Sequence, residues 1–227
     1  MDVRLLYHTP EPERAVAAAA RLCYAPVGAA ELMEAMSEEA VRRVLKTVIT
    51  SGHMSALEHA SYTFAADGVS RAMTHQLVRH RLASYNQQSQ RYVTYADAPT
   101  FIVPPSIDGD PAAAEAFAAA TGAAFDAYRA LLDAGVPAED ARYLLPNAME
   151  TKIVITMNIR ELLHFLELRC CKRAQWEIRE LALAMLDLAE PTAPYIFMDA
   201  GASCRRGPCR EGSMTCGDPY PKAPKRE

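Results

Sequence analysis

The feature that most constrains the fold of this chain is a set of long helical patterns separated by a few short strand patterns. The most regular helical pattern covers 37–52, where Ser37 is a suitable N-cap and Gly52 a suitable stop. Its apolar residues follow the i, i+3, i+4, i+7, i+8 spacing of one helix face: Val41, Val44, Leu45, Val48 and Ile49. The helix must bury that face, and 227 residues with 50% hydrophobic content are ample for a core.

Helical patterns also outnumber strand patterns along the rest of the chain. Asp110 and Asn158 are suitable N-caps for two further helices. The expected helices cover 11–24, 70–84, 111–135, 137–146 and 158–190, the last with a break at 170–173. The expected strands cover 3–7, 61–67 and 151–157. These patterns predict an α+β fold in a single helix-rich domain.

Composition and charge exclude several classes of protein. The formal net charge of −4 and a pI near 5.9 exclude a global basic field of the kind that drives non-specific nucleic-acid binding. No stretch approaches the roughly 20 apolar residues of a membrane span. The first residues, "MDVRLLYHTPEPER", contain acids and a proline where a signal peptide would be apolar. We therefore expect a cytoplasmic enzyme or binding protein.

The six cysteines do not form the pattern of a secreted disulfide framework. Cys23 lies in an alanine-rich helical pattern, and we expect it to be a buried core thiol. The other five are an adjacent pair and a group in the Gly/Pro-rich tail: Cys170, Cys171, Cys204, Cys209 and Cys216. The tail spacings of four and six residues match no zinc pattern with a C-x-x-C pair. Reduced thiols, disulfides and a thiolate metal site all remain open for this group.

The segment "RHRLASYNQQSQRYVTY" at 79–95 contains no acidic residue. The flanking acids are Asp67 and Asp97, so the arginines in and just before the segment have no carboxylate neighbour in sequence: Arg71, Arg79, Arg81 and Arg91. Arginine presents a fixed fork of donors suited to phosphate, and Gln76 shares a helix face with Arg79 in the expected helix. We predict one or two phosphate-bearing ligands here. The alternative is a solvated basic helix face, which would normally also contain lysine and glutamate.

Two other kinds of chemistry have weaker support. Ser89 has no general base nearby in sequence, so we interpret it as a hydrogen-bonding ligand rather than a nucleophile. Four histidines and a glutamate lie within 28 residues, but their spacing fits no zinc-hydrolase pattern: His53, Glu58, His59, His75 and His80. The chain has neither a Walker loop nor G-x-G-x-x-G, so a nucleotide cofactor would bind without the usual glycine loop.

A longer pattern carries a family resemblance. Arg79-His80-Arg81, seven residues and then Ser89, within "RHRLASYNQQSQR", resembles the signature of flavin-dependent thymidylate synthases. Three segments resemble other blocks of that family, in the same order: "SGHMSALEH" at 51–59, "ARYLLP" at 141–146 and "NIRELLHFLELR…AQWEIR" at 158–179. The resemblance implies that family's fold over residues 1–200, with a small, mostly antiparallel sheet. The Cys/Gly/Pro-rich tail at 201–227 lies outside the blocks.

The resemblance implies an enzyme that makes dTMP from dUMP. The methylene group would come from 5,10-methylenetetrahydrofolate and the hydride from reduced FAD, which NADPH regenerates. It also implies a homotetramer with active sites at subunit interfaces, and neither nucleic acid nor a membrane is an expected partner. The phosphate of dUMP and the pyrophosphate of FAD would then be the anions that the arginines bind.

The resemblance also assigns residues, position by position. Expected ligands of dUMP are Gln76, Arg79, Gln87, Gln88, Ser89, Gln90, Arg91, Arg142 and Arg169. Expected flavin contacts are Ser55, Arg79, His80, Arg81, Gln87, Asn158, Arg160 and His164, with His53 beside the isoalloxazine ring. No metal ligand is expected. The chain departs from the family pattern at Gln87, where many members carry glutamate, and at His164, where some carry asparagine.

We expect Arg169 to carry the chemistry, together with His53. A guanidinium held against the uracil edge stabilises negative charge as the ring becomes enolate-like, so C5 becomes nucleophilic without a covalent enzyme thiol. Two hypotheses from other classes are a nucleotide or nucleic-acid binding module without catalysis, and a metal protein built on the tail cysteines.

Overall fold

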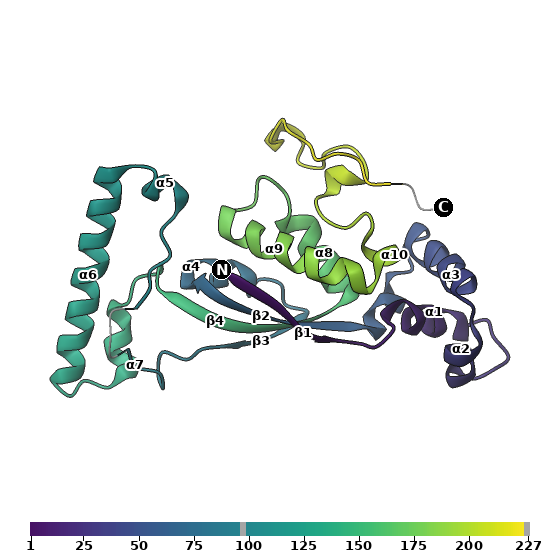
Figure 1. Ribbon diagram of the computed structural model, residues 1–227, viewed down its shortest axis with the longest axis horizontal. Helices are drawn as coiled ribbons and strands as arrows, with labels where there is room; N and C mark the ends of the chain where they lie inside the picture. The colour runs from purple at the N-terminus through teal and green to yellow at the C-terminus, as the bar shows by residue number, and fades with distance from the viewer. Residues whose placement is uncertain (96–98, 225–227) are drawn as a thin grey trace. The chain divides into compact units, whose positions relative to one another are not determined.

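Four strands form one sheet in the computed structural model, which describes residues 1–95 and 99–224 (Figure 1). The strand order is β1-β2-β4-β3. The strands are β1 (Asp2–His8), β2 (Ser61–Ser70), β3 (Ala83–Gln87) and β4 (Glu150–Asn158). In β2 the alternating side chains of Tyr62, Phe64 and Ala66 are fully buried, because successive residues of a strand point to opposite faces.

Neighbouring strands run antiparallel. The N–H of Ile159, just after β4, donates to the carbonyl of Ala60, just before β2, at 2.9 Å. The N–H of Gln88, after β3, donates to the carbonyl of Lys152, near the start of β4, at 2.9 Å, and a similar bond joins the end of β1 to the start of β2. The α+β class and the small antiparallel sheet are therefore confirmed.

The chain divides into two units, and each of the four strands contributes residues to both. Unit 1 contains 1–2, 66–79 and 86–153. Unit 2 contains 3–65, 80–85 and the described residues from 154 onward. The division of the chain at residue 200 stays a prediction, and residues 225–227 of the tail lie outside the described residues.

Unit 1 is built around one long helix. Asp110 caps it by accepting from the N–H groups of Ala112 and Ala113, as predicted. Phe125 and Tyr128 of this helix stack with ring centroids 5.9 Å apart, and Ala141 completes the buried cluster. The helices of unit 1 are α4 (Arg71–Leu77), α5 (Pro105–Asp108), α6 (Pro111–Asp133) and α7 (Ala138–Ala141), followed by the 3-10 turn η2 (Arg142–Leu144).

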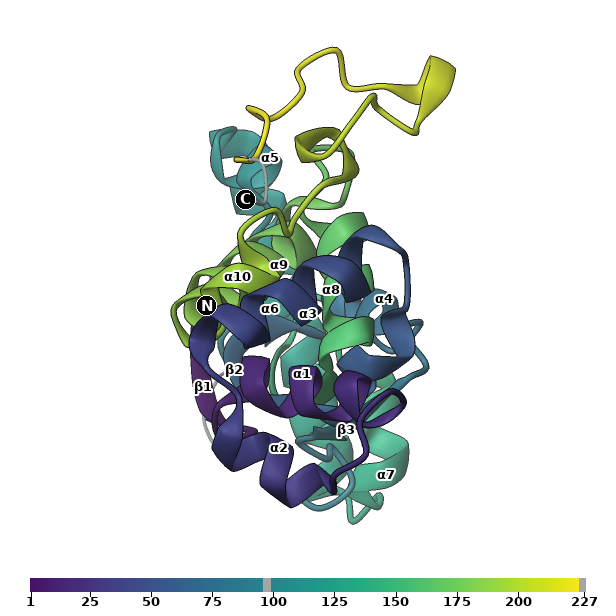
Figure 2. The same ribbon diagram turned by 90° about the vertical axis from the view of Figure 1, so that its right-hand side faces the viewer.

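Unit 2 contains the remaining helices. The α-helices are α1 (Pro12–Leu22), α2 (Ala29–Ala35), α3 (Glu38–Thr50), α8 (Ile159–Arg169), α9 (Trp176–Ala189) and α10 (Pro194–Phe197). The 3-10 turns are η1 (Met54–His59), η3 (Glu190–Thr192), η4 (Ser203–Arg205) and η5 (Gly212–Met214). Figure 2 shows α1, α2 and α3 lying together, and α1 contacts both others. Within the described residues, no helix is long and apolar enough to cross a membrane.

Three expectations about local structure were wrong. The helix expected over 70–84 ends at Leu77, and 83–87 instead forms β3, because these residues pair with β4. Val78 and Leu82, which lie beyond the end of that helix, are exposed. Cys23 is exposed rather than buried, because it lies at the C-cap of α1, and the helix α2 was not expected.

Candidate active site

The residues singled out by the sequence fall into two groups, one in each unit. Unit 1 holds Gln76, Arg79, Gln87, Gln88, Ser89, Gln90, Arg91 and Arg142. Unit 2 holds His53, Ser55, His80, Arg81, Asn158, Arg160, His164 and Arg169.

In unit 1, the polar segment after β3 is held by its own side chains. Gln87 donates from Nε2 to Thr74 Oγ1 at 3.1 Å and to Thr151 Oγ1 at 3.3 Å. Gln90 is buried and donates to the sulfur of Met149 at 3.5 Å. The hydroxyl of Ser89 accepts from the backbone N–H of Arg91 at 3.2 Å. These hydrogen bonds hold the backbone of residues 87–91 in one conformation.

Arg91 does have a carboxylate partner, although none is near it in sequence. Its Nε donates to Glu139 Oε2 at 2.8 Å, and Nη2 lies 2.7 Å from the same oxygen. The side chain of Arg142 donates from Nε to the carbonyl of Glu139 at 3.0 Å. Glu139, at the start of α7, therefore holds both arginines through its side chain and its backbone.

Arg71 adds a third guanidinium to this group. Partial burial lowers its pKa, the phenol of Tyr95 acts in the opposite direction, and the positive charge of Arg142 lowers it further. Two guanidinium groups near enough to repel each other form a site that favours an anion. Gln76 and Arg79 lie at the end of α4 and in the turn after it, where the Arg79 N–H donates to the Gln76 carbonyl at 3.3 Å.

In unit 2, Arg169, His80 and Glu161 form a chain of contacts. Arg169, the last residue of α8, donates from Nε to His80 Nε2 at 3.0 Å. The other ring nitrogen of His80, Nδ1, lies 3.5 Å from Glu161 Oε1. The side chains of His80 and Glu161 are only 4% and 6% exposed, so this pair is buried away from solvent.

Burial and nearby charges keep His80 neutral. Burial lowers the pKa of His80 to about 4, and the positive charge of Arg169 and the ring of His164 act in the same direction. Burial raises the pKa of Glu161, against the opposing effect of His164, and lowers the pKa of Arg169. The ring of His164 packs edge-on against His80, with centroids 5.9 Å apart.

Glu161 is the site residue that the sequence patterns did not identify. Its position three residues after Asn158 predicts a capping box, and Asn158 Oδ1 does accept from the Glu161 N–H at 2.9 Å. In the described residues, however, the Glu161 carboxylate faces His80. Glu161 is buried, and only the structure shows this burial, because a glutamate in the first turn of a helix is usually exposed.

A cavity of about 540 Å³ lies beside η1 in unit 2. His53, Ser55 and His59 contribute polar groups to it, and Arg21 and Arg43 contribute positive charge. The rest of the lining is apolar or hydroxyl-bearing: Ala19, Ala20, Cys23, Tyr24, Val44, Thr47, Val48 and Ala56. Its volume is in the range of about 300–1,000 Å³ that small-molecule sites occupy. The structure brings His53 and Ser55 to one concave site, whereas the other expected flavin contacts of unit 2 do not line it: His80, Arg81, Asn158, Arg160 and His164.

The two remaining arginines of unit 2 differ in their surroundings. Arg160 forms an exposed ion pair with Glu58. Arg81 is exposed, and in the described part of the chain it forms no ion pair, as is true of Arg79 in unit 1. These free guanidinium groups are available to anions.

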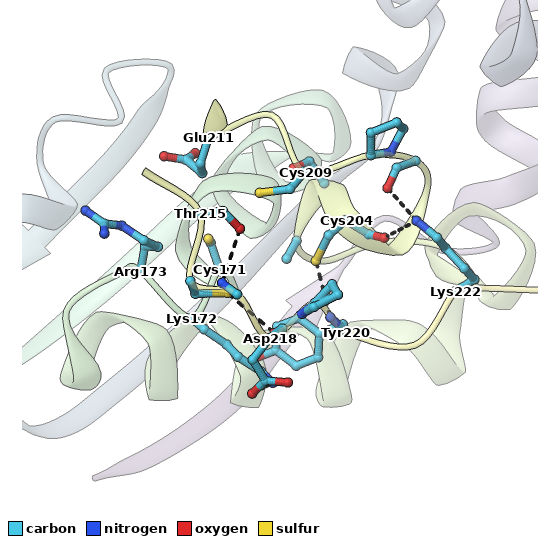
Figure 3. A pocket seen from close by; sticks show the side chains of 17 residues that line it. Cys171, Lys172, Arg173, Cys204, Cys209, Glu211, Thr215, Asp218, Tyr220 and Lys222 are labelled. Atoms are coloured by element: carbon cyan, nitrogen blue, oxygen red, sulfur yellow. Dashed lines mark hydrogen bonds and ion pairs between the residues drawn. The ribbon is translucent and has the colours of Figure 1, made fainter. Parts of the chain in front are cut away.

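The tail cysteines meet in a second cavity of unit 2, with a volume of about 330 Å³ (Figure 3). Cys171, Cys204, Cys209 and Cys216 line it, whereas Cys170 does not. Cys204 Sγ accepts from the Tyr220 N–H at 3.4 Å, and Lys172 pairs with Asp218. All six cysteines are free thiols, and among residues 1–95 and 99–224 no three His, Cys, Asp or Glu side chains are arranged to hold a metal ion.

Comparison with known proteins identifies the family. Residues 4–195 match the family model described as thymidylate synthase complementing protein. A protein of Geobacter sulfurreducens named flavin-dependent thymidylate synthase is 59% identical over 218 residues, which cover 96% of this chain and 94% of the relative. Proteins of the same name from Clostridium tetani and Nitratidesulfovibrio vulgaris are 48% and 46% identical, over 96% and 95% of this chain and 93% and 94% of their own lengths.

These matches span almost the whole chain, including the segments that carry the two groups of candidate residues. The chain is therefore an enzyme of the thymidylate synthase complementing protein family, whose curated members named above are flavin-dependent thymidylate synthases.

Proposed function

We propose that this enzyme makes dTMP from dUMP by reductive methylation, with 5,10-methylenetetrahydrofolate as methylene donor and NADPH as the source of reducing equivalents. The observation that carries the proposal is the environment of Arg169. Its guanidinium is partly desolvated and held by a neutral histidine, and in the described residues it has no carboxylate partner. A desolvated cation without a counter-ion favours a ligand that carries or develops negative charge, and a uracil ring develops such charge when it becomes enolate-like.

Unit 1, taken by itself, offers groups that suit the phosphate of dUMP. Arg142 and Arg71 create a positive site for a phosphate, and Arg91 can add a third guanidinium when it leaves Glu139. The hydroxyl of Ser89 and the amides of the polar segment can complete the shell. The predicted dUMP ligands are retained in full: Gln76, Arg79, Gln87, Gln88, Ser89, Gln90, Arg91, Arg142 and Arg169.

The cavity beside η1 supports a flavin site that includes two of the predicted residues, His53 and Ser55. Its apolar lining suits a flat aromatic ring, His53 and Ser55 offer polar contacts at its edge, and Arg21 and Arg43 favour the negative charge of phosphates. FAD, when bound, would supply the hydride. The predicted flavin contacts also remain part of the proposal: Ser55, Arg79, His80, Arg81, Gln87, Asn158, Arg160 and His164.

The proposal includes a homotetramer and a cytoplasmic location, both expected from the sequence. Large apolar side chains that a monomer would leave in water support an assembly: Tyr24 is 81% exposed, Leu82 71%, Tyr92 80% and Tyr143 84%. Light scattering on the purified protein measures the number of chains directly.

Replacement of Arg169 tests the proposal. We expect Arg169→Ala to lower kcat/KM for dUMP by about 100-fold or more, the size of effect seen when one charge-stabilising donor is removed. The visible absorption of bound flavin should persist. Arg173→Ala is the matched control, because Arg173 is an exposed arginine four residues further along the chain, in the turn after α8. Near-normal turnover in Arg169→Ala would remove this residue from the mechanism, and absence of flavin binding to the wild-type protein would remove the redox chemistry.

A further inference from the structure

We infer that Glu161 is a positioning residue: it fixes the tautomer of His80 and, through it, the position of the Arg169 guanidinium. This inference rests on the proposed function, because only there does Arg169 act on the substrate. It adds a residue to the site, since neither the arginine-rich signature nor the resemblance assigns Glu161 a role.

The first step follows from the hydrogen-bonding capacity of arginine. A guanidinium has only donors, so the Arg169 Nε–H can approach His80 Nε2 at 3.0 Å only if that nitrogen is an acceptor. The ring proton of a neutral histidine must then be on Nδ1. The contact between Arg169 and His80 therefore exists in one tautomer of the ring and not in the other.

The second step identifies what selects this tautomer. Which ring nitrogen carries the proton is set by the hydrogen bond that the other nitrogen makes. Glu161 Oε1 lies 3.5 Å from His80 Nδ1, on the side where the proton must be. The carboxylate is held there because Glu161 is in the first turn of α8, where its backbone N–H is bound by Asn158. The helix N-terminus also favours its negative charge.

The third step concerns the consequence for Arg169. The titratable and charged groups that face His80 are Glu161, Arg169 and His164. Burial, together with the positive charge of Arg169, lowers the pKa of His80 to about 4 and keeps the ring neutral at ordinary pH. The Nε bond uses the donor nearest the aliphatic part of Arg169. In the described residues, no protein acceptor binds Nη1 or Nη2 of Arg169. These two nitrogens are therefore available to donate to a ligand. Loss of the Nε bond would let the guanidinium swing away from that ligand.

The tautomer can be measured without substrate, flavin or activity. We would label the histidines of the full-length protein with ¹⁵N and record their shifts by solid-state NMR, assigning His80 by comparison with His80→Gln. The inference requires a protonated Nδ1 and an unprotonated Nε2 at pH 7. A proton on Nε2 in the wild-type protein overturns it, even if every Glu161 variant fails to fold.

Two substitutions of Glu161 separate positioning from packing. Glu161→Gln keeps an oxygen that accepts from Nδ1–H, so we expect the same His80 tautomer and kcat/KM for dUMP within about threefold of wild type. Glu161→Leu keeps the volume but removes the acceptor, so we expect the proton to move to Nε2 and kcat/KM to fall by roughly 10- to 100-fold. Glu180→Leu, on the exposed face of α9, is the control for the apolar substitution.

The outcomes distinguish the inference from the proposed function. A folded Glu161→Leu protein with wild-type turnover, or equal losses in the Gln and Leu variants, overturns the positioning role. If the wild-type enzyme makes no dTMP, the proposed function fails, while the ¹⁵N measurement still decides whether Glu161 sets the tautomer of His80.

Discussion

The side chain of Gln87 donates from Nε2 to Thr74 Oγ1 across 3.1 Å. The Thr74 hydroxyl is itself a donor to the carbonyl of Arg71 at 2.9 Å, so its single proton is already used. Its oxygen can therefore only accept from residue 87. Thr151, the second acceptor, is 2% exposed and Thr74 is 3% exposed. Position 87 thus requires a donor in this chain.

Gln87→Glu should destabilise the protein at neutral pH. The substitution places a carboxylate against two buried hydroxyl oxygens, one of which cannot donate to it, and we expect a loss of about 1–3 kcal/mol in the free energy of unfolding. Only the protonated carboxyl can donate, so folding raises the pKa of the introduced group. The stability that the introduced carboxyl group contributes is therefore present at low pH, and it is lost as the pH rises through that raised pKa.

Urea unfolding at about pH 5 and about pH 8 measures this pH dependence for both proteins. The difference in the free energy of unfolding between wild type and Gln87→Glu should be larger at the higher pH. A gap that is constant, or that widens at the lower pH, contradicts the argument from the Thr74 proton.

Glu139→Gln should tighten the binding of dUMP. The ion pair between Arg91 and Glu139 is about half exposed, so it is worth no more than about 1 kcal/mol, yet an incoming phosphate must displace it. Removing that competition should lower the Kd for dUMP by up to about fivefold, the factor that 1 kcal/mol represents. Isothermal titration calorimetry measures the Kd.

The control is to introduce Glu139→Gln into a protein that already carries Arg91→Ala. There it should leave the Kd unchanged, because the competing pair no longer exists. Weaker binding in the single variant would mean that Glu139 holds Arg91 in its binding position instead of competing for it.

Local sequence signals predicted the starts of three helices and the end of α3. The side chains of Ser37, Asp110 and Asn158 accept from the N–H groups that their types predict, and Gly52 ends α3 with a φ of 72°. These features depend on residues within one helical turn of each other. For the same reason, the break between α8 and α9 at 170–175 was foreseeable.

What the sequence could not show depends on partners that are far apart along the chain. β3 is a strand because β4 pairs with it, and its own residues carry no clear strand pattern. Glu139 reaches Arg91 across 48 positions and Arg169 reaches His80 across 89. A sequence without acids near its arginines therefore predicts an anionic ligand for them, yet it gives no view of Glu139, which pairs with Arg91.

The cysteines should differ in reactivity according to burial. Cys170 is 2% exposed, and burial raises the pKa of its thiol to about 12, so almost none of it is thiolate at pH 8. Cys23, Cys209 and Cys216 are exposed. We expect iodoacetamide at about pH 8 to modify these three in the folded protein and to modify Cys170 only after unfolding in urea.

Peptide mass spectrometry measures each cysteine separately. The alkylated, urea-unfolded protein is the control for complete reaction. Rapid modification of Cys170 in the folded protein contradicts its placement in the core. Protection of Cys209 and Cys216 in the folded protein would show that the tail thiols are bound, and elemental analysis for zinc and iron would then identify a metal.

The buried phenol of Tyr62 gives a prediction for alkaline pH. The hydroxyls of Tyr62 and Thr192 are 2.7 Å apart, and Thr192 already donates to the carbonyl of Ala189, so Tyr62 is the donor. Burial raises the pKa of Tyr62 to about 12, and the charge of Glu13 acts in the same direction. Tyr62→Phe should therefore cost about 1 kcal/mol at pH 7, the typical net value of one hydrogen bond.

The same raised pKa sets how this difference changes with pH. In the unfolded chain the phenol ionises near its ordinary pKa of about 10, so the folded state binds more protons above that pH. The stability that Tyr62 contributes is full below about pH 10 and is lost as the pH rises toward about 12. Urea unfolding at about pH 8 and about pH 11 should show the advantage of wild type over Tyr62→Phe shrinking at the higher pH. Tyr7→Phe, at a tyrosine that is 66% exposed, is the matched control and should show no such change. An advantage that grows above pH 10 would mean that the phenol ionises more easily in the folded protein than in the unfolded chain, which its burial forbids.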